Sequence, residues 1–312
     1  MSPRRAGFLF PLLLAACLFG MAGAAERPAL LFPPDLALIP DAKVKLFAYR
    51  PPGGAADNLL VNGVSSNPWE GEMFLKGEVE LAPGLNLIQA FGQTVRLFVL
   101  QNARMERFRL PGAKEGEELV FQRYGLHPAL DDGCDGCHVA TGGKLTAKNQ
   151  LEACYACHGD FSKEEEGKKP YVHSPVRSGE CTSCHDPHFS ARPKLYKVEK
   201  GCLECHDPFP STGTVHRPVA NGECLSCHSP HASTAPMQLR RWGNALCLGC
   251  HADTHEIHRT AEVRGRITQV PEDFPREKGN LSCFGCHAPH QTPERKLFVK
   301  ERTELCKTCH RF

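Results

Sequence analysis

A pentapeptide of the form Cys-x-x-Cys-His occurs eight times in this chain, and it constrains the fold more than any other feature. The first cysteines of the eight motifs are Cys134, Cys154, Cys181, Cys202, Cys224, Cys247, Cys283 and Cys306. The second cysteines are Cys137, Cys157, Cys184, Cys205, Cys227, Cys250, Cys286 and Cys309. The histidines are His138, His158, His185, His206, His228, His251, His287 and His310. Every cysteine except Cys17 therefore belongs to a motif.

This spacing is typical of covalent haem attachment, in which two thiols add to the vinyl groups of one haem and the adjacent histidine binds the iron. The distances between motifs also fit a zinc ribbon, and an exported chain would permit disulfides. Neither alternative requires a histidine after every cysteine pair. With 16 histidines in 312 residues, that coincidence has a probability on the order of one in ten billion. The motifs therefore predict eight covalently bound haem c groups with iron.

The number of remaining histidines equals the number of motifs. These histidines are His127, His173, His188, His216, His231, His255, His258 and His290, and we expect them to be the distal ligands. Three of them lie in extended motifs of the form Cys-His-x-Pro-His, which end at His188, His231 and His290. So short a segment cannot place both of its histidines on opposite faces of one haem. We therefore expect the later histidine to bind a neighbouring haem.

The motifs are arranged in four two-haem units, which begin near His127, His173, His216 and His258. The segments 173–181 and 216–224 are nearly identical, and His127-Pro128 precedes Cys134 in a similar way. The first unit lacks the x-Pro-His extension, whereas the fourth is preceded by the additional His255.

Residues 127–310 thereby resemble the doubled Cys-x-x-Cys-His multihaem cytochromes, whose units have the form His-x-Pro-x4-Gly-x-Cys-x-x-Cys-His-x-Pro-His. The resemblance implies low-potential, closely spaced haems that transfer electrons in periplasmic respiratory chains, including anaerobic respiration, or towards extracellular acceptors. Redox proteins are the partners it implies, with periplasmic or inner-membrane donors and outer-membrane or extracellular acceptors.

Residues 1–25 have the features of a secretory signal peptide, with basic Arg4 and Arg5, an apolar run and small residues up to Ala25. We expect an exported, periplasmic protein, with an outer-membrane-anchored or extracellular location as the alternative. Leu14-Ala15-Ala16-Cys17 also resembles a lipoprotein signal, which would place a lipid anchor at Cys17. No later segment is long and apolar enough to predict a membrane span.

The sequence predicts two unlike domains. Residues 26–101 contain no cysteine or histidine, and their short β-rich runs and turns predict a small β-sandwich. The run from Val61-Asn62-Gly63 to Pro83-Gly84 resembles bacterial Ig-like modules. Residues 102–126 are charged and broken by Gly and Pro, which favours a linker. Residues 127–312 predict a coil-rich octahaem cytochrome c domain with short α-helices at the motifs.

Without residues 1–25 the chain has 35 basic and 35 acidic residues, since Arg4 and Arg5 are lost from the 37 basic ones. Ferric haems, each contributing about one negative charge, would bring the protein to roughly −8, so nucleic acid is not an expected partner. About 23 residues per haem are too few for a conventional apolar core. We therefore expect the haems to form the core and the haem-free region not to fold.

Two alternatives to an electron carrier remain. An octahaem redox enzyme of the nitrite or hydroxylamine type would need one iron with an open position, and His127, His255 and His258 are the least regular ligands. The histidine count is sufficient to close all eight irons, so we predict no catalytic residue and no enzyme. A subunit of a conductive filament would need terminal haems exposed at complementary ends.

Overall fold

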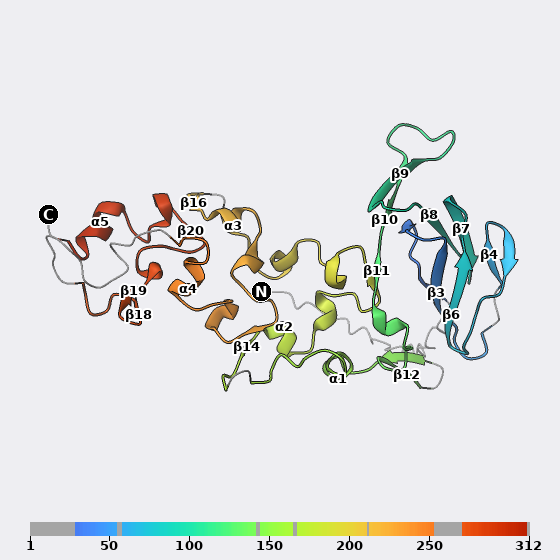
Figure 1. Ribbon diagram of the computed structural model, residues 1–312, viewed down its shortest axis with the longest axis horizontal. Coiled ribbons are helices and arrows are strands. Elements are labelled where there is room, and N and C mark those ends of the chain that lie inside the picture. Colours follow the sequence, from blue (N-terminus) through green and yellow to red (C-terminus); the bar gives the residue numbers. More distant parts are fainter. Residues whose placement is uncertain are drawn as a thin grey trace, which may run out of the picture.

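The computed structural model describes residues 29–54, 58–141, 144–164, 167–210, 212–252 and 270–310. These residues form an elongated molecule with a β-rich region at one end and the C-terminus at the other (Figure 1). The predicted signal peptide, Cys17, His255 and His258 lie outside the described residues. The observed architecture is a β-rich N-terminal region followed by a coil-rich region with short helices and 3-10 turns at the motifs.

The β-rich region contains two sheets. The smaller sheet has the antiparallel order β1-β3-β6, with strands β1 (Ala29–Phe32), β3 (Lys43–Tyr49) and β6 (Phe74–Glu80). The larger sheet has the order β5-β4-β7-β8-β2-β10-β9, with strands β5 (Val64–Ser66), β4 (Leu59–Val61), β7 (Gly84–Ala90), β8 (Gln93–Val99), β2 (Ala37–Ile39), β10 (Glu118–Gln122) and β9 (Met105–Arg109). Strand β2 is parallel to both β8 and β10, whereas the other pairs are antiparallel.

Alternating apolar residues of both sheets form one hydrophobic core. Along β8, Val95, Leu97 and Val99 are buried while the residues between them are partly exposed, as the two-residue period of a strand requires. Leu46 from β3 and Leu97 from β8 are completely buried in this cluster. Asn86 is a buried polar exception, and its side-chain amide donates to the carbonyls of Ala82 and Gly84 at 2.7 and 2.9 Å. The amide therefore satisfies backbone groups at the turn that precedes β7.

The segment 102–126, which the sequence analysis treated as a linker, contains regular structure. It forms the β9–β10 hairpin, which projects from the larger sheet in Figure 1 and is joined to β2 through Gln122 and Ala37. Phe121 of β10 is completely buried. The charged residues that suggested a connector pair across the outer face of the hairpin, where Arg109 lies 2.9 Å from Glu118. The sheet therefore extends past residue 101.

The described part of the coil-rich region consists of short elements. The helices are α1 (Gln150–Tyr155), α2 (Ser174–Arg177), α3 (Arg217–Ala220), α4 (Asn244–Cys247) and α5 (Arg302–Lys307). The 3-10 turns are η1 (Pro128–Leu130), η2 (Cys181–Ser183), η3 (Pro193–Leu195), η4 (Gly201–Glu204), η5 (Cys224–Ser226), η6 (Pro236–Gln238), η8 (Cys283–Gly285) and η9 (Arg295–Leu297).

Within the residues described after 124, the strands form five two-stranded ladders. The ladders β12 (His138–Thr141) with β13 (Lys144–Ala147) and β18 (Arg276–Glu277) with β19 (Asn280–Leu281) are local hairpins. The other three join successive units, namely β11 (Gly125–Leu126) with β15 (Phe189–Ser190), β14 (Tyr171–Val172) with β17 (Ala232–Ser233), and β16 (Thr214–Val215) with β20 (Gln291–Thr292).

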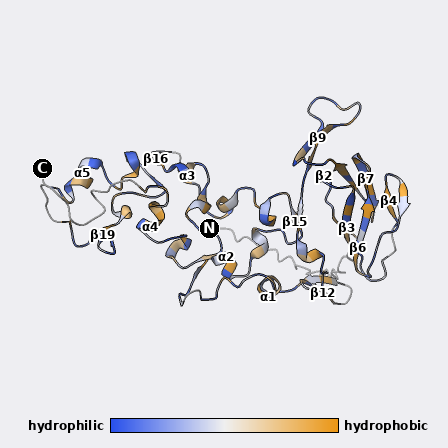
Figure 2. Ribbon diagram, viewed as in Figure 1, coloured by the Kyte–Doolittle hydropathy of each residue, from blue (hydrophilic) through white to orange (hydrophobic). Residues whose placement is uncertain are grey.

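Hydrophobic burial differs sharply between the two regions. Hydrophobic residues are concentrated in the β-sheets, whereas hydrophobic and hydrophilic residues alternate along the coil-rich region (Figure 2). Among the described residues after 126, only Val172, Ala235 and Leu239 are buried hydrophobic residues. Protein side chains alone therefore supply little core to this region. No helix within the described ranges is both long and apolar enough to cross a membrane.

Candidate haem sites

All eight Cys-x-x-Cys-His motifs fold into the same tight turn. In each copy the backbone N–H of the histidine donates to the carbonyl of the first cysteine, at distances of 2.9–3.1 Å. This turn places both cysteines and the histidine of a motif on a single loop of backbone, although the motifs lie on α-helical, 3-10 and irregular segments. The described cysteines are all free thiols, as haem attachment would require before the reaction.

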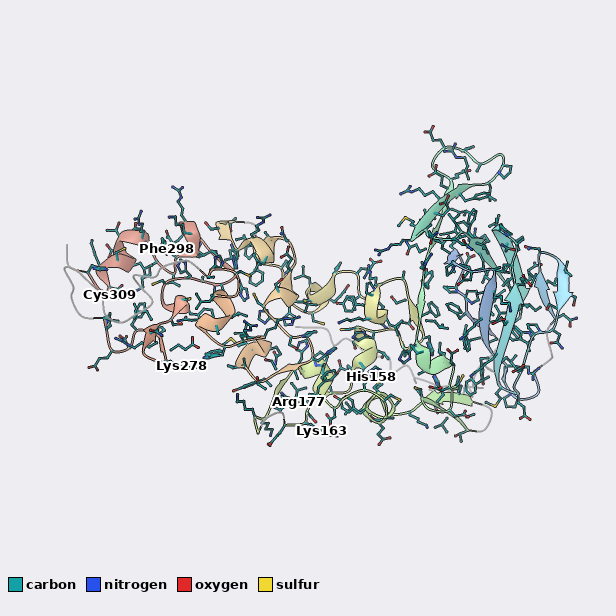
Figure 3. All side chains as sticks on the ribbon, in the orientation of Figure 1. His158, Lys163, Arg177, Lys278, Phe298 and Cys309 are labelled. Carbon is teal, nitrogen blue, oxygen red and sulfur yellow. The ribbon has the colours of Figure 1, made fainter. Side chains whose placement is uncertain are left out.

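Three pairs of histidine rings face one another within single units. In each pair, the first histidine of the unit lies opposite the histidine of the second motif. The ring centroids are 6.1 Å apart for His127 with His158, His173 with His206, and His216 with His251. The angles between the ring planes are 10°, 14° and 26°, respectively. His158, which lies in the middle of the molecule, is labelled in Figure 3.

Three further pairs cross from one unit to the next. In each of these pairs, the first-motif histidine faces the last histidine of the following Cys-His-x-Pro-His segment. The centroid distances are 6.0 Å for His138 with His188, 5.9 Å for His185 with His231, and 6.0 Å for His228 with His290. Of the candidate ligands, His255 and His258 lie outside the described residues, so pairs that contain His287 and His310 are not described.

The spacing of the six pairs fits an iron held between two imidazoles. A metal–nitrogen bond is roughly 2 Å long and a ring centroid lies roughly 1 Å behind its nitrogen, so two axial imidazoles have centroids about 6 Å apart. Incidental aromatic contacts spread over about 4.5–7 Å, whereas all six pairs here fall between 5.9 and 6.1 Å. Together with the thiols beside them, the donors present therefore suit covalently attached haem.

Three proximal histidines have their ring orientation fixed by backbone carbonyls. The Nδ1 atoms of His185, His228 and His287 lie 2.9–3.0 Å from the carbonyl oxygens of Lys194, Met237 and Lys296, respectively. A carbonyl can only accept, so Nδ1 carries the proton in each ring. Nε2 is then left with a free lone pair, which is the form that binds a metal.

An unusual backbone turn presents each of these carbonyls. The turn contains two successive non-glycine residues with positive φ, which are Lys194–Leu195, Met237–Gln238 and Lys296–Leu297. The φ values lie between 51° and 59°, a region that L-amino acids seldom occupy twice in succession. A hydroxyl closes each turn, because Ser190, Ser233 and Thr292 donate to the carbonyls of Tyr196, Leu239 and Phe298. Among the described residues, two successive non-glycine residues with positive φ occur only where they support a predicted iron ligand.

The first histidines of the second and third units are held by the unit that follows each of them. His173 and His216 have Nδ1 at 3.0 Å from the carbonyls of Pro230 and Pro289. The N–H of His173 also donates to the carbonyl of His231 at 2.8 Å, and the N–H of His216 donates to that of His290 at 2.9 Å. One Pro-His segment therefore makes three contacts. The Pro carbonyl orients the ring of a candidate ligand in the preceding unit, and the His carbonyl accepts the backbone N–H of that same residue. The His ring itself faces another histidine.

Burial favours the neutral form of several of these imidazoles. Desolvation lowers the pKa of His127, His138, His231 and His290, and the facing histidine lowers each of them further. Because only a neutral imidazole can donate a lone pair to iron, this shift acts in the direction that ligation needs.

The thiols show how successive motifs are arranged in space. Burial, together with the charge of the Cys181 thiol in the next unit and a hydrogen bond with it, raises the pKa of the Cys154 thiol to about 11. Equivalent contacts join Cys202 to Cys224 and Cys247 to Cys283. Within units, the charges of Cys205, Cys250 and Cys309 act on Cys184, Cys227 and Cys286. Motifs that are neighbours in sequence are therefore neighbours in space.

The turns that present carbonyls to three of the proximal histidines, and the hydroxyls that close them, were not predicted from the sequence. A signal was present, because a Ser or Thr follows two residues after each Cys-His-x-Pro-His segment. It became interpretable only when the structure placed Ser190 against the carbonyl of Tyr196 and the same loop against the ring of His185.

A model of the doubled CXXCH motif matches this chain at residues 173–211, 216–256 and 274–312. These segments contain six of the eight motifs. No curated protein matches the chain. The doubled motifs indicate a multihaem c-type cytochrome that carries electrons on covalently bound haem c.

Proposed function

We propose that this protein is an octahaem electron carrier in which every haem is attached by one Cys-x-x-Cys-His motif and ligated by two histidines. The observation that supports this most strongly is the common spacing of 5.9–6.1 Å in six imidazole pairs, each of which contains a motif histidine. Bound haem supplies one-electron iron chemistry. Two firmly held imidazoles per iron leave no position for a substrate, so the chain's own residues favour transfer over catalysis.

The repeat extends this assignment to the two remaining haems. In the first three units, the first histidine faces the histidine of the second motif, as in the pair of His127 with His158. The same rule pairs His258 with His310 in the fourth unit. His287 is then the one motif histidine without an assigned partner, and His255 is the one remaining histidine of this sequence outside the signal segment. We therefore assign His255 to the haem of Cys283 and Cys286.

The haems form a linear relay in sequence order. The thiol contacts that link Cys154 to Cys181 and Cys247 to Cys283 support this order at the boundaries between units. Electrons then move between adjacent haems without any cofactor leaving the chain. The two ends of the relay are the haem of Cys134, beside the β-rich region, and the haem of Cys306, near the C-terminus (Figure 1).

The haems also serve as the core of residues 127–312. With only three buried hydrophobic residues among the described part of this region, most of the apolar surface that folding must cover belongs to the porphyrins. We place the mature protein outside the cytoplasm, most simply in the periplasm, with redox proteins as its donors and acceptors. The β-rich region is an Ig-like module, and Cys17 is an alternative point of lipid anchorage.

Haem stoichiometry tests the proposal. The intact mass of the purified chain, together with its haem absorbance after denaturation in alkaline pyridine, should show eight covalent haems. Replacing both Cys202 and Cys205 with Ala should remove one haem, whereas Cys17→Ala, which alters the only cysteine outside the motifs, should leave eight. A chain that binds zinc at these cysteines, or that carries fewer than eight haems, contradicts the proposal.

A further inference from the structure

The first unit lacks the device that holds the proximal histidine in the later units. After His138 the chain enters the β12–β13 hairpin instead of a Cys-His-x-Pro-His turn, so no left-handed turn returns a carbonyl to the ring. The Nδ1 atom of His138 is buried and has no hydrogen-bond partner within the described ranges. By contrast, the equivalent atoms of His185 and His228 meet carbonyls at 2.9 and 3.0 Å.

The β-rich module occupies the space beside this histidine. Phe74 of β6 lies with its ring centroid 6.2 Å from that of His138. On the same strand, the ammonium of Lys76 donates to the carbonyl of Asp131 at 2.6 Å, which fixes the loop that leads into the first motif. Burial raises the pKa of the Cys134 thiol and the charge of Lys76 opposes that rise, so the Lys76 ammonium lies within electrostatic reach of the thiol.

The β-rich module also packs near His188, the histidine that faces His138. Phe189 directly follows His188 in the chain. Phe189 packs against Phe32 of β1 with centroids 5.6 Å apart and against Tyr124 at 5.8 Å. Aromatic residues from the N-terminal region therefore pack beside the proximal histidine and behind the distal one. The later units have aromatic contacts of their own, since Tyr196 lies 6.0 Å from His185, Phe161 lies 4.5 Å from His231 and Phe209 lies 4.7 Å from His290.

We propose that the β-rich module caps the haem of Cys134 and Cys137 and holds its reduction potential above those of the equivalent haems in the second and third units. The inference rests on the proposed function, because it requires a haem between His138 and His188. The feature that separates this haem from the other two is the Nδ1 atom of His138, unpaired among the described residues, because an imidazole whose Nδ1–H has no acceptor donates less charge to iron. The Lys76 ammonium acts in the same direction, since it disfavours the more positive ferric state, although Lys197 and Arg240 also lie within electrostatic reach of Cys184 and Cys227.

Asp186 is a local feature that acts in the opposite direction. Its carboxylate oxygen lies 3.6 Å from Nδ1 of His188 and carries negative charge that favours ferric iron. The same oxygen already accepts the backbone N–H groups of His188 and Phe189 at 2.8 and 3.2 Å, which disperses that charge. The equivalent positions in the later units are Ser229 and Ala288. Asp186 thus reduces the rise in reduction potential that the cap produces. Its replacement by Asn should therefore shift the potential in the opposite direction to Lys76→Gln.

Spectroelectrochemical titration of the full-length holoprotein tests the cap. Lys76→Gln should lower the potential of one-eighth of the haem absorbance, changing its reduced-to-oxidised ratio at a fixed poise by roughly three- to tenfold, where tenfold corresponds to about 59 mV for one electron. Asp186→Asn should raise the reduction potential of the same one-eighth of the haem absorbance. Lys114→Gln makes the same charge change in the loop of the β9–β10 hairpin, away from the first motif, and should move nothing.

The outcomes separate the cap from the relay. If Lys76→Gln retains eight haems but shifts none of them, or shifts all of them equally, the cap is refuted and the relay stands. If both Lys76→Gln and Asp186→Asn move one component in opposite senses, the cap is supported. A wild-type chain that lacks haem at Cys134 and Cys137, as shown by the mass of that peptide, refutes the relay before the cap is tested.

Discussion

His231→Ala should open a haem that is attached to a different unit from the one that carries the substitution. His231 belongs to the third unit, directly after the motif that ends at His228, but its ring faces His185 of the second unit at 5.9 Å. The substitution removes one axial imidazole and leaves the backbone bond from His173 N–H to the carbonyl of residue 231, which is 2.8 Å long in the native chain. Ligation is therefore changed while the junction between units remains tied.

The expected magnitude follows from the pairing. One haem in eight becomes five-coordinate, so about one-eighth of the haem should become high-spin and one carbon monoxide should bind per chain, against none in the native protein. Added imidazole should enter the vacated space and restore the low-spin spectrum. Electron paramagnetic resonance and carbon monoxide titration of the reduced protein provide the two readouts.

A second background identifies the haem that opens. When Cys181 and Cys184 are both replaced by Ala, the haem facing His231 is absent, and adding His231→Ala should create no new carbon monoxide site. In a background with Cys224 and Cys227 replaced, the same substitution should still create one. If the two backgrounds give the reverse result, His231 serves the haem of its own motif and the pairing between units is wrong.

Three other substitutions probe separate parts of the account. Leu46→Ala removes a completely buried side chain from the β-core and should cost about 2–5 kcal/mol in the unfolding of that region, without loss of haem, as measured by thermal melts. The Arg96 guanidinium lowers the pKa of Asp35, so this pair stabilises the fold above pH 4 or so and the stabilisation is lost as pH falls through the lowered value. Asp35→Asn should therefore lower stability at neutral pH, by less than about 1 kcal/mol because solvent screens the pair, and flatten the acid limb of the stability curve. Met237→Val places a β-branched residue at a φ of 57° and should displace the carbonyl from His228 and raise the potential of one haem, whereas Met237→Gly should not.

The candidate haem-binding residues are visible in the sequence because the chemistry of haem attachment dictates their spacing. Two vinyl groups and one iron require two thiols and an adjacent imidazole, so the motifs are visible without any knowledge of the fold. The prediction that the last histidine of a Cys-His-x-Pro-His segment serves a neighbouring haem depended on a local length argument. The structure places His188 opposite His138 and His290 opposite His228, which is the arrangement that ligation between units would need.

The supports of those ligands could not be predicted, because they depend on backbone conformation. The left-handed pair Met237–Gln238 has no glycine or asparagine to mark it, so its sequence gives no sign of a positive φ. The strain is offset by tertiary contacts, among them the hydroxyl of Ser233 on the carbonyl of Leu239. These contacts exist only once the repeats are stacked.

The boundary of the β-rich region was misjudged for a different reason. Charged residues such as Arg109 and Glu118 pair across the exposed face of a hairpin, and a one-dimensional pattern does not distinguish that face from a solvated linker. Phe121 argues against a linker, because its side chain on β10 is completely buried. The parallel pairing of β2 with β8 and β10 likewise joins segments that are distant in sequence.

The most direct test of the central claim is the spin state of the oxidised holoprotein, measured by electron paramagnetic resonance with and without nitric oxide. A closed relay predicts that all eight haems are low-spin and that nitric oxide leaves the spectrum unchanged. One high-spin haem, or one that binds nitric oxide, would contradict the claim that two histidines close every iron, and would identify a site at which chemistry could take place.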